Sequence, residues 1–178
     1  WVERLRDALA NDHFLFHYQP VIPLLGAPGG IYETFLQLDT GDGERVTDLS
    51  FMQIAADHGL LGEIDRWKIS RAIEIAAKRA NGPKPVRLMV KLNQASLVDE
   101  SLPGFIKEQL SVHGVAGNCL LLQVPESKAF INLVAVQELA NEVGKLGCQM
   151  VLEQFGAGID SLQLLSHFKP GFIKLDPR

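Results

Sequence analysis

Short apolar runs alternate with longer amphipathic stretches along this chain, and the alternation limits the fold more than any other feature. The apolar runs cover residues 14–24, 31–38, 87–92, 120–124, 149–155 and 172–175. Their length and their content of Val, Ile, Leu and Phe are typical of strands buried on both faces. Between them, apolar residues recur at helical spacing, as at Ile69, Ala72, Ile73 and Ala76. The pattern predicts an α/β protein.

The connections between the runs indicate the topology. Residues 25–30 join the first two runs and are rich in Gly and Pro, which suits a hairpin better than a crossover. Beyond the second run, strands and helices alternate, which favours parallel strands. We therefore expect a parallel sheet or barrel with an antiparallel first strand. In such folds, ligands bind at the carboxyl ends of the strands.

Composition limits the class of protein. The 178 residues suffice for one domain, and no apolar run approaches the roughly 18 residues of a membrane span. Nothing at the N-terminus resembles a signal peptide, so we expect a cytoplasmic protein in which Cys119 and Cys148 are buried free thiols. The chain begins at Trp1 without an initiator Met, which indicates a piece of a longer protein. The net charge of −4 disfavours a nucleic-acid polymer as partner but permits a small phosphate ligand.

Polar residues close each of the apolar runs. Most of them can be explained as residues that simply end a strand. Lys91, Glu153 and Lys174 differ, because they lie inside or beside apolar runs, where an ionised group is costly unless it is paired or faces a site. Together they predict a polar pocket at one mouth of a barrel.

Several phrases occur in a fixed order along the chain. They are YQP at residues 18–20, ETF at 33–35, FMQIAADHGLL at 51–61, IDRW at 64–67, FGAGIDSL at 155–162 and IKLD at 173–176. In order and spacing they resemble the motifs of EAL domains over nearly the whole chain. Each phrase alone is a weak signal, but the ordered set is specific.

Active EAL domains are cyclic di-GMP phosphodiesterases built on a TIM-like barrel whose first strand is antiparallel. They use two divalent metals held by hard oxygen ligands. The resemblance implies one EAL-like domain over residues 1–178 with this fold. The family continues through two further strand–helix units after the phrase at 173–176, so we expect a barrel that lacks its last units. Such a barrel exposes a sheet edge, which favours self-association.

The resemblance carries over few of the family's metal ligands. Glu33 is kept, but Lys91 stands at the place of a ligand Asn and Gln123 at that of a ligand Glu, while a pair of Asp residues becomes Glu153 and Gln154. The four carboxylates of the family set are reduced to two, and Lys91 adds a positive charge. An ammonium about 4 Å from a metal repels it by several kcal/mol at intermediate dielectric. We therefore expect no metal cofactor and no catalytic residue.

The residues that would bind the ligand match the family better. Gln19, Phe35 and Leu36 match positions that line the nucleotide groove, and Asp65 matches a carboxylate that pairs with a guanine edge. Glu126 matches a Glu that supports a neighbouring loop. The resemblance thus implies a cyclic di-GMP site, with Lys91 offering its charge to a phosphate in place of a metal. Its residues are Gln19, Glu33, Phe35, Leu36, Asp65, Lys91, Glu153 and Lys174.

These observations favour a catalytically inactive EAL domain that binds cyclic di-GMP without metal and signals to a protein partner. Among degenerate members, the pattern is most similar to the FimX-like receptors, which implies a PilZ-domain partner and a role in type IV pilus control. Two alternatives stay open. One is a slow phosphodiesterase that uses Glu33, Glu153, Gln123 and one loosely held metal. The other is an interaction scaffold without ligand, which would have no need for Gln19, Glu33 and Asp65 together.

Overall fold

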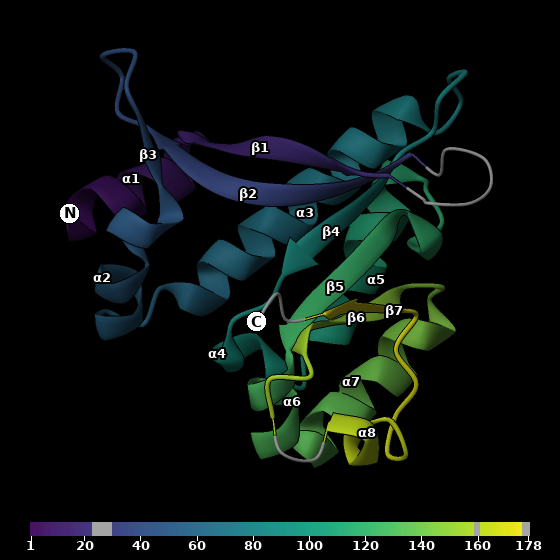
Figure 1. Ribbon diagram of the computed structural model, residues 1–178. Coiled ribbons are helices and arrows are strands. Elements are labelled where there is room, and N and C mark those ends of the chain that lie inside the picture. The colour runs from purple at the N-terminus through teal and green to yellow at the C-terminus, as the bar shows by residue number, and fades with distance from the viewer. Residues whose placement is uncertain (23–29, 159–160, 176–178) are drawn as a thin grey trace.

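A mixed seven-stranded sheet forms the centre of the molecule. The computed structural model describes residues 1–22, 30–158 and 161–175 (Figure 1). Six strands pair in the order β1-β2-β4-β5-β6-β7 from one edge to the other, with β1 antiparallel to β2 and every later neighbour parallel. These strands are β1 (Phe14–Val21), β2 (Ile31–Asp39), β4 (Arg87–Lys91), β5 (Leu120–Pro125), β6 (Gln149–Phe155) and β7 (Phe172–Leu175).

The α/β prediction with an antiparallel first strand is therefore confirmed. Each predicted strand forms, and β6 and β7 have the predicted bounds. A seventh strand, β3 (Arg45–Thr47), pairs with the end of β2 and was not predicted, because three residues are too few for a period. Most of the expected hairpin connection over residues 25–30 lies outside the described residues.

Helices follow most strands along the chain. They are α1 (Val2–Asn11), α2 (Met52–Asp57), α3 (Leu61–Arg79), α4 (Gln94–Leu97), α5 (Leu102–His113), α6 (Glu126–Ile131), α7 (Leu133–Lys145) and α8 (Ser161–Leu164), with short 3₁₀ turns η1 (Asp48–Ser50) and η2 (Gly117–Cys119). In the part of the chain that the structure describes, none of these helices is both long and apolar enough to cross a membrane.

The main core lies between one face of the sheet and the long helices. Helix α3 buries the apolar residues that recur at helical spacing. These are Ile69, Ala72, Ile73 and Ala76, each at most 2% exposed. They pack with apolar residues of α5, α7 and the strands in one cluster. Full burial of each large aliphatic side chain contributes about 1.5–3 kcal/mol, so this cluster is the principal source of stability.

Both cysteines lie in this core as free thiols, as predicted. Burial raises the pKa of the Cys148 thiol to about 12. The thiol therefore stays protonated at neutral pH and behaves as a small apolar group.

Candidate functional site

The opposite face of the sheet is built in two layers. Met89, Leu121 and Val151 form an apolar cluster, and Ile31 and Phe172 pack against it. Two positions further along the same five strands stand five polar residues. Because side chains on a strand alternate with a period of two, they lie on the same face, one layer nearer the carboxyl ends of the parallel strands. We call them the polar layer: Glu33, Lys91, Gln123, Glu153 and Lys174.

The polar layer is one connected chain of contacts. The Lys174 Nζ atom lies 2.5 Å from Glu33 Oε1. The Gln123 Nε2 atom donates to Glu33 Oε1 at 3.0 Å and to Glu153 Oε2 at 3.1 Å. At the other end, Lys91 Nζ lies 3.0 Å from Glu153 Oε1. Two carboxylates and two ammonium groups give this layer a formal charge of zero.

Exposure differs between the two kinds of charge. The Glu33 and Glu153 side chains are 16% and 9% exposed, whereas those of Lys174 and Lys91 are 37% and 53% exposed. The carboxylates therefore lie beneath the ammonium groups. The layer is neutral as a whole, yet it presents cations to whatever approaches it.

One carboxylate oxygen of the polar layer has no well-aligned donor. Glu153 Oε1 is buried and accepts no hydrogen bond, although Lys91 Nζ is near enough for an ion pair. The Lys91 ammonium balances the charge of the Glu153 carboxylate, but its geometry relative to Oε1 is not that of a hydrogen bond.

The donor set of the polar layer does not fit two divalent cations. Such metals take several oxygen ligands, and here each carboxylate is already paired with a lysine. Gln123 turns its amide nitrogen, which is a donor, toward both carboxylates. No group of three or more His, Cys, Asp or Glu side chains suited to a metal occurs among the described residues.

Strand β1 extends this surface beyond the polar layer. Gln19 pairs with Glu33 across the β1–β2 ladder, and His17 pairs with Phe35. Cross-strand partners point to the same face. The His17 and Phe35 rings are 6.3 Å apart between centroids, and Phe35 is 37% exposed. The structure therefore brings Gln19 and Phe35 to the same face of the sheet as the polar layer.

Sequence reasoning missed two participants in this surface. Gln123 enters the sequence predictions only at the place of a metal ligand, and His17 does not enter them. The period of two was the available signal, because it places His17 with Gln19 and places Gln123 above Leu121.

The expectation that Leu36 lines a ligand groove is wrong. Its side chain is 4% exposed and belongs to the main core under the helices. Phe35 and Leu36 are neighbours on β2, so they point to opposite faces of the sheet. Phe35 therefore lies on the face of the polar layer, and Leu36 lies on the face of the main core.

Asp65 also lies away from the polar layer, in contrast to its expected contact with a guanine edge. The residue is fully buried at the start of α3. Its carboxylate accepts hydrogen bonds from Asn93 N at 2.7 Å, Asn93 Nδ2 at 2.7 Å and Ser96 Oγ at 2.6 Å, and Lys68 Nζ lies 3.1 Å away. With these donors in place, the carboxylate has no exposed edge for a base.

The end of β6 is shaped by Glu126, the first residue of α6. Glu126 Oε2 accepts hydrogen bonds from Gly156 N and Gly158 N, each at 3.2 Å, which confirms the predicted support of a neighbouring loop. Beside it, Gln154 has a φ of 55°, a left-handed conformation that is uncommon for residues other than glycine. Gln154 follows Glu153 within β6, and the turn begins two residues later, at Gly156.

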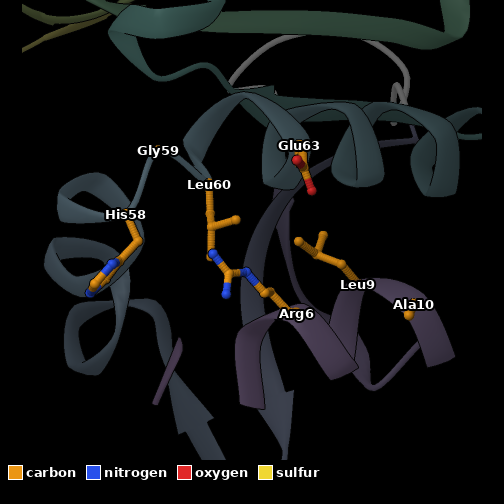
Figure 2. Close-up of a pocket in the computed structure, with 7 residues that line it drawn as sticks. All are labelled: Arg6, Leu9, Ala10, His58, Gly59, Leu60 and Glu63. Atoms are coloured by element: carbon orange, nitrogen blue, oxygen red, sulfur yellow. The ribbon is translucent and has the colours of Figure 1, made fainter. Parts of the chain in front are cut away.

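A separate hollow lies between α1, α2 and the start of α3 (Figure 2). Its volume is about 570 Å³, and Arg6, His58 and Glu63 bring polar groups to it while Leu9 and Leu60 line it with apolar ones. It includes no residue of the polar layer. Arg6 also pairs weakly with the exposed Glu3 at 3.5 Å.

Comparisons with solved structures give close matches. The EAL domain of FimX from Xanthomonas citri, solved in complex with c-diGMP, is 45% identical with a TM-score of 0.92, covering 99% of this chain and 68% of that chain. The FimX EAL domain from Pseudomonas aeruginosa, solved bound to c-di-GMP, is 31% identical with a TM-score of 0.91. The match covers 98% of this chain and 70% of the Pseudomonas chain.

Comparisons of sequence agree with these matches. The family model described as EAL domain matches residues 2–178. The cyclic di-GMP phosphodiesterase PdeF of Escherichia coli K12 is 27% identical over 98% of this chain. The chain spans 23% of the length of that relative.

Proposed function

Because the chain belongs to the EAL domain family, we propose that it is a receptor domain that binds cyclic di-GMP without a metal and does not hydrolyse it. The barrel fold of that family supplies the scaffold. The observation that carries the proposal is the polar layer, in which ammonium groups lie above paired carboxylates.

The charges of the polar layer suit a ligand with two phosphates. Lys91 and Lys174 are its exposed members, and charge-assisted hydrogen bonds from ammonium to phosphate are among the stronger polar contacts. Glu33 and Glu153 are neutralised from within, so they do not repel the ligand. Phe35 and His17 add an aromatic surface beside the layer, and stacking of a base on such a ring contributes about 1–3 kcal/mol.

The same contacts argue against hydrolysis. Metal-assisted phosphodiester cleavage needs carboxylates free to hold cations that activate a water. Here the two carboxylates are engaged by Lys174, Lys91 and Gln123. The polar layer therefore favours binding of the intact dinucleotide.

The narrower proposal is a FimX-like role, in which the bound domain signals to a PilZ-domain protein in type IV pilus control. The 45% identity to the Xanthomonas citri FimX EAL domain supports it. A pull-down with a purified PilZ-domain protein, with and without cyclic di-GMP, tests this role. Ligand-dependent capture is expected, and equal recovery in both samples would contradict it.

Calorimetry with cyclic di-GMP in EDTA tests the receptor proposal. Binding is expected in the wild type and is expected to weaken strongly when both Lys91 and Lys174 are changed to Ala. The matched control is Lys145→Ala, which removes an exposed lysine from an ion pair on α7 and should leave affinity unchanged. No binding by the wild type at tens of micromolar would overturn the proposal and favour an interaction scaffold.

The rival function is slow hydrolysis with one divalent cation, and the unaligned Glu153 Oε1 atom is the observation that favours it. Incubation with cyclic di-GMP and Mn²⁺, followed by chromatography for linear pGpG, separates the two. The receptor proposal expects no product. Sustained turnover that disappears in EDTA would establish the enzyme instead.

A further inference from the structure

A buried ion pair lies beneath the end of β4, outside the polar layer. Asp65 and Lys68 are one helical turn apart on α3, and their side chains are 0% and 8% exposed. Burying two charges is costly unless their remaining donors and acceptors are satisfied. Both are satisfied here by groups at the end of β4 and in α4.

These groups hold the backbone on both sides of Leu92. Lys68 Nζ donates to the carbonyl oxygen of Lys91 at 2.5 Å, and Asp65 accepts from both nitrogens of Asn93. Between these contacts, Leu92 N donates to Gln123 O at 2.9 Å. The last residue of β4 is thus fixed from α3 and from β5, at the point where the chain leaves the sheet.

Lys91 depends on this support more than the other charged members of the polar layer do. Its side chain is 53% exposed, and Glu153 is the one carboxylate that the described residues place within ion-pair distance. An exposed ion pair alone holds a lysine weakly. The direction of the ammonium is therefore determined largely by the backbone of Lys91.

We infer that Lys68 and Asp65 are positioning residues that hold Lys91 over Glu153, so that its ammonium can receive a ligand phosphate. The inference rests on the proposed cyclic di-GMP binding. It also explains why Asp65 is wholly buried: it acts on the ligand through β4 rather than by touching a base.

A double-mutant cycle tests the inference. Lys68→Met removes the donor to the Lys91 carbonyl oxygen and leaves Asp65 with its three hydrogen bonds from Asn93 and Ser96. Calorimetry with cyclic di-GMP is expected to show an affinity loss of about tenfold in the wild-type background, which lies within the coupling measured between residues in contact. In a Lys91→Ala background, the same substitution is expected to change affinity less than about twofold.

A control on the same helix separates positioning from general loosening of α3. Ser70→Ala removes a hydrogen bond of 2.8 Å to Gln109 Oε1 on α5 and should leave affinity unchanged. Urea titration shows whether the Lys68→Met variant is folded. If it is not, Asn93→Ala takes its place in the cycle, because that substitution removes the side-chain donor to Asp65 and keeps the backbone N–H donor.

The outcomes distinguish the inference from the proposed function. No binding by the wild type means that the receptor proposal fails. Binding by the wild type, with an equal loss from Lys68→Met in both backgrounds or with no loss at all, overturns the positioning role alone.

Discussion

Gln123 joins the two carboxylates of the polar layer through one amide nitrogen. A carboxylate at this position would face Glu33 and Glu153 at hydrogen-bonding distance, and the three like charges would repel one another. With an amide there, the layer is neutral without any added cation. Gln123 and Lys91 thus pair with the carboxylates of the layer from within the protein.

Substituting both Lys91 and Gln123 should create a cation site in the polar layer. In Lys91→Asn with Gln123→Glu, the polar layer changes from a formal charge of zero to −2, because one ammonium is lost and one carboxylate is gained. We expect Mn²⁺ binding by calorimetry in the double variant and much weaker binding in the wild type. Lys145→Asn, which lowers the charge of α7 instead, is the control. Equal Mn²⁺ affinity in wild type and double variant would contradict the prediction.

At the scale of elements, α6 and the turn after β6 behave as one unit. Glu126 starts α6, and its carboxylate receives the backbone N–H groups of Gly156 and Gly158. The residue is 4% exposed, so its charge is stabilised mainly by these donors. The position of the turn that begins at Gly156 therefore depends on a helix from the preceding strand–helix unit.

Glu126→Gln should loosen this turn while leaving the sheet intact. The neutral amide keeps the shape of the side chain but accepts weaker hydrogen bonds, so we expect amide exchange at Gly156 and Gly158 to accelerate by about tenfold. Hydrogen exchange followed by NMR measures it, with the β5 amides as internal reference. Glu142→Gln, on the exposed face of α7, should have no such effect. Unchanged exchange at both glycines would show that other contacts hold the turn.

The sequence was most informative about where the strands lie, and least informative about which face of the sheet each side chain takes. Apolar runs predicted every strand of the main path, most clearly β4, β5 and β6, because burial on both faces leaves a continuous apolar pattern. The cost of a charge inside an apolar run indicated Lys91, Glu153 and Lys174, and the resemblance added Glu33. The structure brings the four together. The resemblance erred for Leu36, since a motif does not say which face a residue takes. The burial of Asp65 could not be predicted either, because its partners Asn93 and Ser96 lie in a segment distant in the sequence.

At the scale of the whole molecule, the described sheet is open, with β1 at one edge and β7 at the other (Figure 1). Strand β7 pairs with β6 on one side, and its Ile173 and Leu175 side chains are 41% and 76% exposed. An apolar edge strand can pair with another chain.

The 178-residue chain should therefore self-associate as its concentration rises. Light scattering after size-exclusion chromatography measures the mass, and Leu175→Lys should shift it toward the monomer because charge on an edge strand opposes pairing. Leu49→Lys changes a side chain that is 91% exposed in η1, away from the sheet edge, and should have no effect. A monomer at all concentrations would contradict the prediction.

The two layers on the inner face also bear on how such a domain can change over evolutionary time. Each residue of the polar layer stands two positions after an apolar residue on the same strand. A substitution in the polar layer therefore does not change the residues of the apolar cluster. A lineage can therefore exchange one chemistry for another without first losing its fold. We therefore expect related domains to differ in the polar layer while they keep the apolar cluster beneath it.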